Sequence, residues 1–182
     1  MEKKSLMKSL LAGGLILVFT ATSCSSGGTK HDHSSHAEGE HAAAAEAPAP
    51  GFEDPKVEEV YQHYIHLKDA LVASDAAEAK PAAAALQTAL TDAGSTAGAD
   101  LAGKIASTSD IKAQRSELDA LTAEVEGLIK SAKLASGKIF KQHCPMANEG
   151  KGGYWLASEK AIKNPYYGDE MMTCGSVEAE IN

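Results

Sequence analysis

Two short motifs near the C-terminus contain most of the sulfur-bearing side chains of this chain. Residues 143–146 read His-Cys-Pro-Met, and residues 171–175 read Met-Met-Thr-Cys-Gly. Beyond residue 24, both cysteines and all three methionines lie in these two motifs. Thiolates and thioethers together suit Cu(I) better than hard cations, whereas zinc sites are more usually built from Cys and His. The composition therefore predicts a soft-metal site.

The expected ligands come from both motifs. Pro145 restricts the residue before it, which limits the relative positions of the two flanking sulfurs. If residues 171–174 form a helical turn, the first and last of them face the same way. The candidate metal ligands are Cys144, Met146, Met171 and Cys174, with His143 as an optional nitrogen ligand. Cu(I) is the best match, followed by silver and then zinc.

The same residues allow readings without a metal. A disulfide between Cys144 and Cys174 would close a loop of roughly thirty residues and stabilise the fold by about 3–4 kcal/mol. The methionines could fill gaps in a core. Metal binding and a disulfide can also alternate, because a reduced pair binds metal and an oxidised pair does not.

The N-terminus has the pattern of an export signal. Three lysines within the first eight residues precede an apolar run from Leu10 to Phe19, and small residues then lead to Cys24. The run is too short for a stable bilayer span. Ala-Thr-Ser-Cys resembles the lipobox of bacterial lipoproteins, although Ala21 stands where Leu is most typical. We therefore expect residues 1–23 to be a signal peptide and Cys24 to be lipidated. This places the protein in the cell envelope, anchored to the outer membrane and facing the periplasm.

Residues 24–51 have the composition of a flexible, His-rich tether. The segment has no large apolar side chain to offset the entropy of ordering, and it ends in an Ala/Pro run. It contains four histidines close together: His31, His33, His36 and His41. Imidazoles at this density predict a weak site for Cu(II), Zn or Ni, and a soluble linker that happens to be His-rich is the alternative.

Residues 52–176 are expected to form one domain, mainly α-helical. Apolar residues recur at three- and four-residue spacing from residue 55 to 71, and Asp75 with Glu78 fits a capping box for a second helix that ends at Gly94. A short helix is expected within 95–109 and the longest within 110–136. About four such helices predict a small antiparallel bundle.

The stretch after residue 137 loses the helical period. Short extended segments are expected at 139–144 and 154–156, with a turn at Asn164-Pro165. This predicts a loop-rich C-terminal cap on the bundle. Residues 177–182 are expected to be a frayed tail.

Charge and motif content exclude several functions. The net charge of −8 argues against nucleic acid as a partner, because such proteins need basic patches. No nucleophile and base pair, phosphate loop or paired carboxylates occur at informative spacing. The two C-terminal cysteines are too far apart in sequence for a Cys-x-x-Cys redox motif. An enzyme is not expected.

The C-terminal motifs carry a family resemblance. Residues 143–147 (His-Cys-Pro-Met-Ala), 154–156 (Tyr-Trp-Leu), 162–168 (Ile-Lys-Asn-Pro-Tyr-Tyr-Gly), Met171 and 174–175 (Cys-Gly) resemble the signature of an uncharacterised exported lipoprotein domain family. That family is associated with CusB-type adaptors of copper and silver efflux pumps. The resemblance extends more weakly over roughly residues 55–175. It implies a helical domain linked to heavy-metal handling.

Two functions follow as hypotheses. The first is a lipid-anchored periplasmic protein that binds Cu(I) and sequesters it or delivers it to an efflux adaptor or pump. The second is a non-catalytic envelope interaction module whose cap is held by a Cys144–Cys174 disulfide. The redox state of this cysteine pair separates the two.

Overall fold

The computed structural model describes residues 49–182 of the chain. Within them the helices are α1 (Pro55–Val72), α2 (Ala76–Asp92), α3 (Thr96–Ser107), α4 (Ile111–Ser116), α5 (Leu118–Ala132), α6 (Ala147–Gly150) and the short 3-10 helix η1 (Gly168–Glu170). The strands are β1 (Gly51–Phe52), β2 (Leu134–Ser136), β3 (Ile139–Cys144), β4 (Gly153–Ala157) and β5 (Ser176–Ile181). This part of the chain is mainly helical, with antiparallel strands in its C-terminal region, as the sequence predicts.

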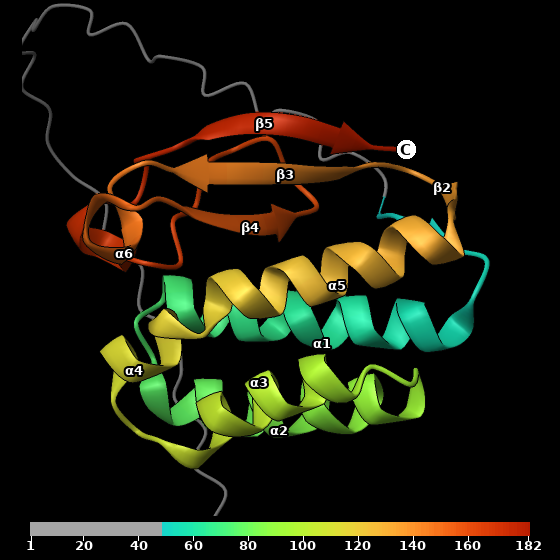
Figure 1. Cartoon of the computed structure of the whole chain (residues 1–182). Helices are drawn as coiled ribbons and strands as arrows, with labels where there is room; N and C mark the ends of the chain where they lie inside the picture. Colours follow the sequence, from blue (N-terminus) through green and yellow to red (C-terminus); the bar gives the residue numbers. More distant parts are fainter. Residues whose placement is uncertain (1–48) are drawn as a thin grey trace, which may run out of the picture. The chain divides into compact units, whose positions relative to one another are not determined.

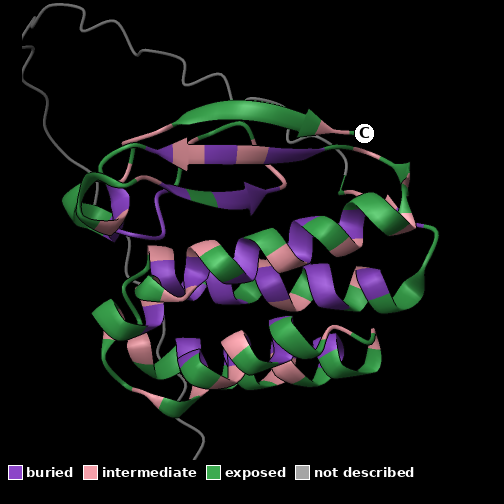
Figure 2. Ribbon diagram, viewed as in Figure 1, coloured by how far each residue is buried: buried purple, intermediate pink, exposed green. Residues whose placement is uncertain are grey.

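The elements form stacked layers (Figure 1). Helices α2 and α3 pack together, α1 and α5 lie next to them, and the three-stranded sheet lies beyond α5. The sheet has the antiparallel order β4-β3-β5, and β4 is the strand nearest the helices. Buried side chains line the inner faces of these layers, whereas β5 is largely exposed (Figure 2). No helix described between residues 49 and 182 is long and apolar enough to cross a membrane.

Polar caps set the starts of the main helices. Asp54, Asp75 and Asp110 each accept a hydrogen bond from backbone N–H groups of the first helical turn, and Ser95 does so for α3. Such a cap typically contributes about 1 kcal/mol. The predicted caps at Asp75 and Gly94 are confirmed, since Gly94 follows α2 with a φ of 84°. The Glu78 half of the capping box is not formed, because the Asp75 N–H donates to the carbonyl of Ala70 and the Glu78 carboxylate pairs with His66.

The expected four-helix bundle is not confirmed. The predicted helix over 110–136 is divided at Glu117 into α4 and α5, and α5 ends at Ala132. The residues after it instead form β2, which pairs with β1 from the other end of the domain. This strand pairing supplies backbone hydrogen bonds that a longer helix would have made within itself.

The C-terminal residues also differ from the expectation. Residues 176–181 form β5 along β3, where the sequence predicted a frayed tail. Two salt bridges hold this strand at its end, because Glu180 pairs with Lys138 at 2.6 Å and with Lys160 at 3.0 Å. The sheet therefore has β4 and β5 as its two edges.

Side chains of the helices accept hydrogen bonds from backbone N–H groups on the outer edge of β4. The backbone N–H of Tyr154 donates to Asp119 Oδ1 on α5 at 2.7 Å, and the N–H of Leu156 donates to the hydroxyl of Tyr64 on α1 at 3.1 Å. Tyr64 also bonds Thr122 of α5 at 2.8 Å. Unpaired edge groups would be costly when buried. These contacts fix the sheet, and with it the end of β3, against the helices.

Candidate functional site

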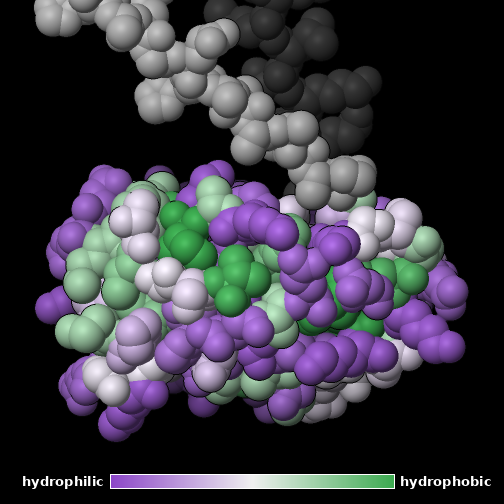
Figure 3. Space-filling view, turned by 90° about the horizontal axis from the view of Figure 1, so that it is seen from above, coloured by the Kyte–Doolittle hydropathy of each residue, from purple (hydrophilic) through white to green (hydrophobic). Residues whose placement is uncertain are grey.

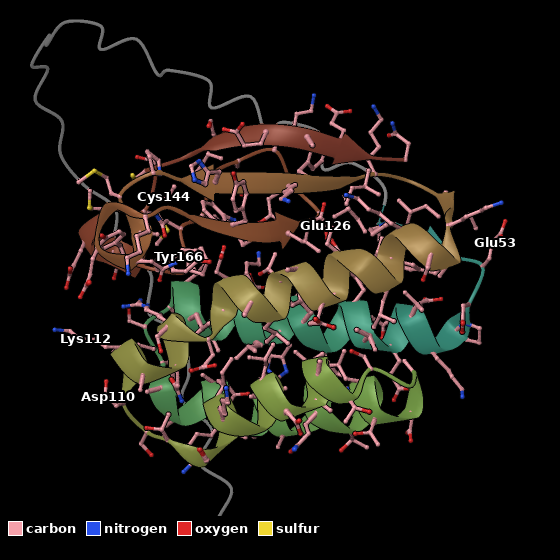
Figure 4. The ribbon with its side chains drawn as sticks, in the orientation of Figure 1. Glu53, Asp110, Lys112, Glu126, Cys144 and Tyr166 are labelled. Atoms are coloured by element: carbon pink, nitrogen blue, oxygen red, sulfur yellow. The ribbon has the colours of Figure 1, made fainter. Side chains whose placement is uncertain are left out.

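Cys144 and Cys174 meet at one end of the sheet. Their Sγ atoms lie 2.9 Å apart, although the residues are 30 positions apart in the chain. Cys144 is the last residue of β3 and is fully buried, whereas Cys174 lies on the loop before β5 and is half-buried. Figure 4 shows Cys144 at the same end of the molecule as Tyr166. The structure thus brings the two predicted thiols into contact, with one of them accessible.

Asn164 holds the loop that carries Cys174. Its buried side chain donates to the carbonyl of Cys174 at 2.9 Å and accepts from the N–H of Tyr166 at 2.8 Å. Its own N–H donates to the carbonyl of Met172 at 2.9 Å. One buried amide therefore links the Asn-Pro turn to the second sulfur motif. The sequence predicts the turn, but it does not predict this role of the side chain.

Gly175 allows the close approach of the two motifs. A β-carbon at this position would lie 2.8 Å from the carbonyl oxygen of His143 and 2.9 Å from the ring of Trp155. Real β-carbons are not found so close to such atoms, and Gly175 also has a φ of 144°. A glycine directly after Cys174 is therefore needed to bring its thiol to Cys144.

Arg115 ties the cap to the helices. Its Nε donates to the carbonyl of Pro165 at 2.7 Å, and its Nη2 donates to the carbonyl of Leu71 at 2.9 Å and to Ser74 Oγ at 2.8 Å. A guanidinium suits this task because its donors diverge in a fixed plane. Arg115 is a positioning residue, a role that the sequence alone does not indicate.

Both candidate methionine ligands are accessible. Met146 is 52% exposed and Met171 is 36% exposed. Met171 stays next to Cys174 because its carbonyl accepts the Cys174 N–H at 3.0 Å, and the carbonyl of Met146 accepts from the Tyr167 hydroxyl at 2.6 Å. Figure 3, seen from the side that carries β5, shows hydrophobic residues exposed between hydrophilic ones. Exposed, unbranched thioether side chains can change rotamer freely.

His143 lies away from the thiols. Neighbouring residues of a strand point to opposite faces, so the ring of His143 leaves β3 on the side opposite Cys144. It stacks on Tyr154 with ring centroids 4.4 Å apart, and its Nδ1 is 3.9 Å from Glu178. A β-carbon at Gly152 would lie 2.5 Å from its Nε2. The structure therefore does not bring the optional nitrogen ligand together with the sulfurs.

Trp155 lies next to the loop that carries Cys174, because a β-carbon at Gly175 would lie 2.9 Å from its ring. It is fully buried and meets Tyr166 edge-on, with ring centroids 6.2 Å apart. Its indole N–H has no hydrogen-bond partner among the described residues. An aromatic ring near a metal site can contact a cation or anchor the apolar core. Because Trp155 is fully buried, its position matches an apolar anchor.

The environment favours a protonated thiol at Cys174. The hydrogen bond with Cys144, partial burial and the nearby second thiol raise the pKa of Cys174, and the backbone N–H of Met146 opposes this. A soft metal would have to displace that proton, because the thiolate is the ligand. Binding at this site should therefore release protons.

The described residues limit the ligands available. Between residues 49 and 182, no three side chains of the His, Cys, Asp or Glu type converge as a metal site. Among the described residues, a third ligand at the thiol pair would therefore have to be a methionine. The predicted lipidation site Cys24 and the histidines of the tether, His31, His33, His36 and His41, lie outside the described residues.

Comparison with known proteins covers the helical part of the chain. No curated protein and no solved structure matches this chain. One family does match, but the matched stretch ends before the first cysteine motif, so it includes neither thiol. Residues 60–137, which span most of α1 through β2, match the family described as Protein of unknown function (DUF3347).

Proposed function

We propose that this protein binds a soft metal ion, Cu(I), as cargo between Cys144 and Cys174. The observation that carries the proposal is the 2.9 Å contact between a buried thiol and an accessible thiol, with exposed methionines next to both in sequence. Two thiolates and a thioether form a soft ligand set that favours Cu(I) over hard cations. Silver has the same preference, and zinc is disfavoured because His143 lies on the other face of β3.

The geometry requires a small opening of the site. A metal–sulfur bond of about 2.3 Å at a tetrahedral angle places two sulfurs roughly 3.8 Å apart. Metal entry would therefore separate the thiols by about 0.9 Å from their present contact. Cys174 is the one able to move, because it lies on a loop, whereas Cys144 ends the central strand β3 and pairs there with Gly153 of β4.

The cellular setting of the proposal comes from the sequence. A leader, a lipidated Cys24 and a His-rich tether would hold the domain in the periplasm and gather metal weakly. The C-terminal motifs favour delivery to a copper or silver efflux adaptor or pump as the next step. The acidic net charge of −8 agrees with a cation as cargo. The proposed role is binding and transfer, without catalysis.

The test is a Cu(I) competition titration with a chromogenic chelator on the reduced full chain. Cys24 is replaced by Ser and the four tether histidines by Gln, which removes other ligands. One equivalent should be held tightly, and Cys144→Ser should lose it. Met171→Leu should weaken binding by about tenfold, the loss of roughly 1.4 kcal/mol.

The matched control is His143→Gln, which alters a neighbouring residue on the other face of the strand. It should leave the Cu(I) affinity unchanged. No competition by the parent protein, or equal affinities for the parent and Cys144→Ser, would refute a metal site at the thiols.

A structural disulfide is the second candidate, favoured by the same short contact. The thiols are already in van der Waals contact, so oxidation needs little rearrangement of the chain. In that case the cap would be a locked surface for a partner in the envelope. Alkylation of the protein as isolated, with and without reductant, separates the two candidates. Quantitative oxidation that resists mild reductant favours the disulfide, and free thiols favour the metal site.

A further inference from the structure

A cavity lies between α4 and the cap, and neither thiol lines it. Its volume is about 570 Å³. One wall is α4, the opposite wall is the turn around α6 and η1, and Tyr166 and Tyr167 lie between them. Sites for small molecules commonly have volumes of about 300–1,000 Å³ and combine apolar walls with a few polar groups. The cavity is therefore large enough for a ligand of amino-acid size.

The two walls carry opposite charges. Lys112 and Arg115 line the α4 wall, and Glu149 and Glu170 line the opposite one, with Lys151 beside them. Within residues 49–182, none of these five side chains forms an ion pair within 4 Å. Burial lowers the pKa of Arg115, and the negative charge of Glu170 partly opposes this shift. The carboxylate therefore acts on Arg115 across the cavity. Opposite charges thus face each other across the cavity without meeting.

Most other lysines of the described domain behave differently, although Lys56 and Lys80 bond only uncharged oxygens. Lys68, Lys138 and Lys141 each reach a carboxylate within 3.3 Å. The charges of the cavity remain apart because they sit on separate walls. A molecule with a negative and a positive end could bridge them and neutralise both walls at once.

The middle of the cavity is suited to an apolar or aromatic group. The side chain of Ile111 and the two tyrosine rings line it. Both hydroxyls are turned to backbone carbonyls, Tyr166 to Tyr154 at 2.7 Å and Tyr167 to Met146 at 2.6 Å. Both rings are therefore held in place at the cavity.

The wall that carries Glu149 has an unusual backbone. Asn148 and Glu149 have φ values of 52° and 60°, a left-handed conformation that is costly for residues with a side chain. The amide of Asn148 stabilises the turn by donating to the carbonyl of Gly152 at 2.9 Å. This conformation places Glu149 on the cavity wall.

We propose that this cavity binds a small zwitterion, an α-amino acid with an apolar or aromatic side chain. Its carboxylate would lie toward Lys112 and Arg115, its ammonium group toward Glu149 and Glu170, and its side chain between the tyrosines and Ile111. This inference goes beyond the proposed metal function. It does not depend on the state of the thiols.

The test is an NMR titration of the reduced, metal-free full chain with L-phenylalanine, L-tyrosine and L-leucine. At least one should bind saturably, with shifts concentrated at residues 111–116, 148–151 and 166–170. N-acetyl-L-phenylalanine lacks the positive end and L-phenylalaninamide lacks the negative end. Each should bind at least tenfold more weakly than L-phenylalanine.

Matched variants localise the site. Lys112→Gln and Glu170→Gln each remove one charge from opposite walls and should weaken L-phenylalanine binding by about tenfold. Glu53→Gln, at the opposite end of the domain (Figure 4), should have no effect. Absence of saturable binding by all three amino acids would overturn the proposal. So would equal binding of the blocked derivatives, or shifts located elsewhere.

Discussion

Oxidation of the cysteine pair should stabilise the protein by a calculable amount. A bond between Cys144 and Cys174 closes a loop of 30 residues, from the difference of their positions. The loop-entropy relation gives about 3.6 kcal/mol at 25 °C for this length. Because the sulfurs already touch in the folded state, little strain should reduce this gain. The melting temperature should rise by roughly 7–15 °C for a chain of this size.

The assay is urea unfolding of the full chain carrying Cys24→Ser, once fully reduced and once oxidised. The difference in the free energy of unfolding should approach the calculated value, with a lower slope for the oxidised form, whose unfolded state is more compact. Cys174→Ala, treated in the same two ways, should show no difference. If two thiols remain titratable after oxidation, or if the oxidised protein is no more stable, the reasoning from the sulfur contact is wrong.

Three further predictions concern the pH dependence of the site and its supports. Because the pKa of Cys174 is raised and the metal binds two thiolates, Cu(I) affinity should fall as pH decreases from 8 to 6, by about tenfold per pH unit for each proton released and up to about a hundredfold for both; a flat profile would contradict proton release. Arg115→Ala removes the three hydrogen bonds that Arg115 makes to Pro165, Leu71 and Ser74, and the free energy of unfolding in urea should fall by about 2–4 kcal/mol. Arg115→Lys should recover part of this loss. A loss below about 1 kcal/mol would show that the cap does not need Arg115. Gly152→Ala should destabilise the protein by more than about 1 kcal/mol, because Gly152 has a φ of 86° and a β-carbon there would meet His143. Gly127→Ala, in an open helical position, should stabilise the protein by about 0.5–1 kcal/mol. Stability changes of the same sign for both variants would refute the conclusion that Gly152 is required by its backbone conformation.

Local signals in the sequence predict the helical part well. Asp54, Asp75 and Asp110 are capping residues in the structure because each side chain bonds backbone groups only two or three positions away. Helix periodicity likewise depends on neighbours in sequence. Such features need no knowledge of the rest of the fold.

Features that depend on distant pairing were missed. Strand β2 exists because Leu134–Ser136 meets Gly51–Phe52, more than 80 residues earlier, and no local pattern indicates this. β5 had a signal, since Val177, Ala179 and Ile181 alternate with polar residues. Its exposure on both faces and its terminal position made the segment resemble a tail.

The candidate site was only partly predictable for the same reason. Residue types alone indicated that soft ligands cluster in two motifs, but not which of them meet. The extended conformation of residues 139–144 was predicted, and alternation along that strand already implies that His143 and Cys144 point to opposite faces. By contrast, the roles of Asn164 and Arg115 come from contacts with residues up to 50 positions away.

The two cysteines are not equivalent, and the difference determines how the site would be used. Cys144 is fully buried in a strand paired on both sides, so its sulfur has a fixed position. Cys174 is accessible, lies on a loop and keeps its proton more tightly than an ordinary thiol. The sulfur separation of 2.9 Å lies between the about 2.05 Å of a disulfide and the roughly 3.8 Å expected around a metal. A shift of the loop by about 1 Å in either direction would therefore reach either state. An incoming metal carrier would therefore meet Cys174 first, with Cys144 as the second ligand. In the oxidised pair, an incoming thiolate would attack the accessible sulfur of Cys174 and release Cys144 as the thiolate.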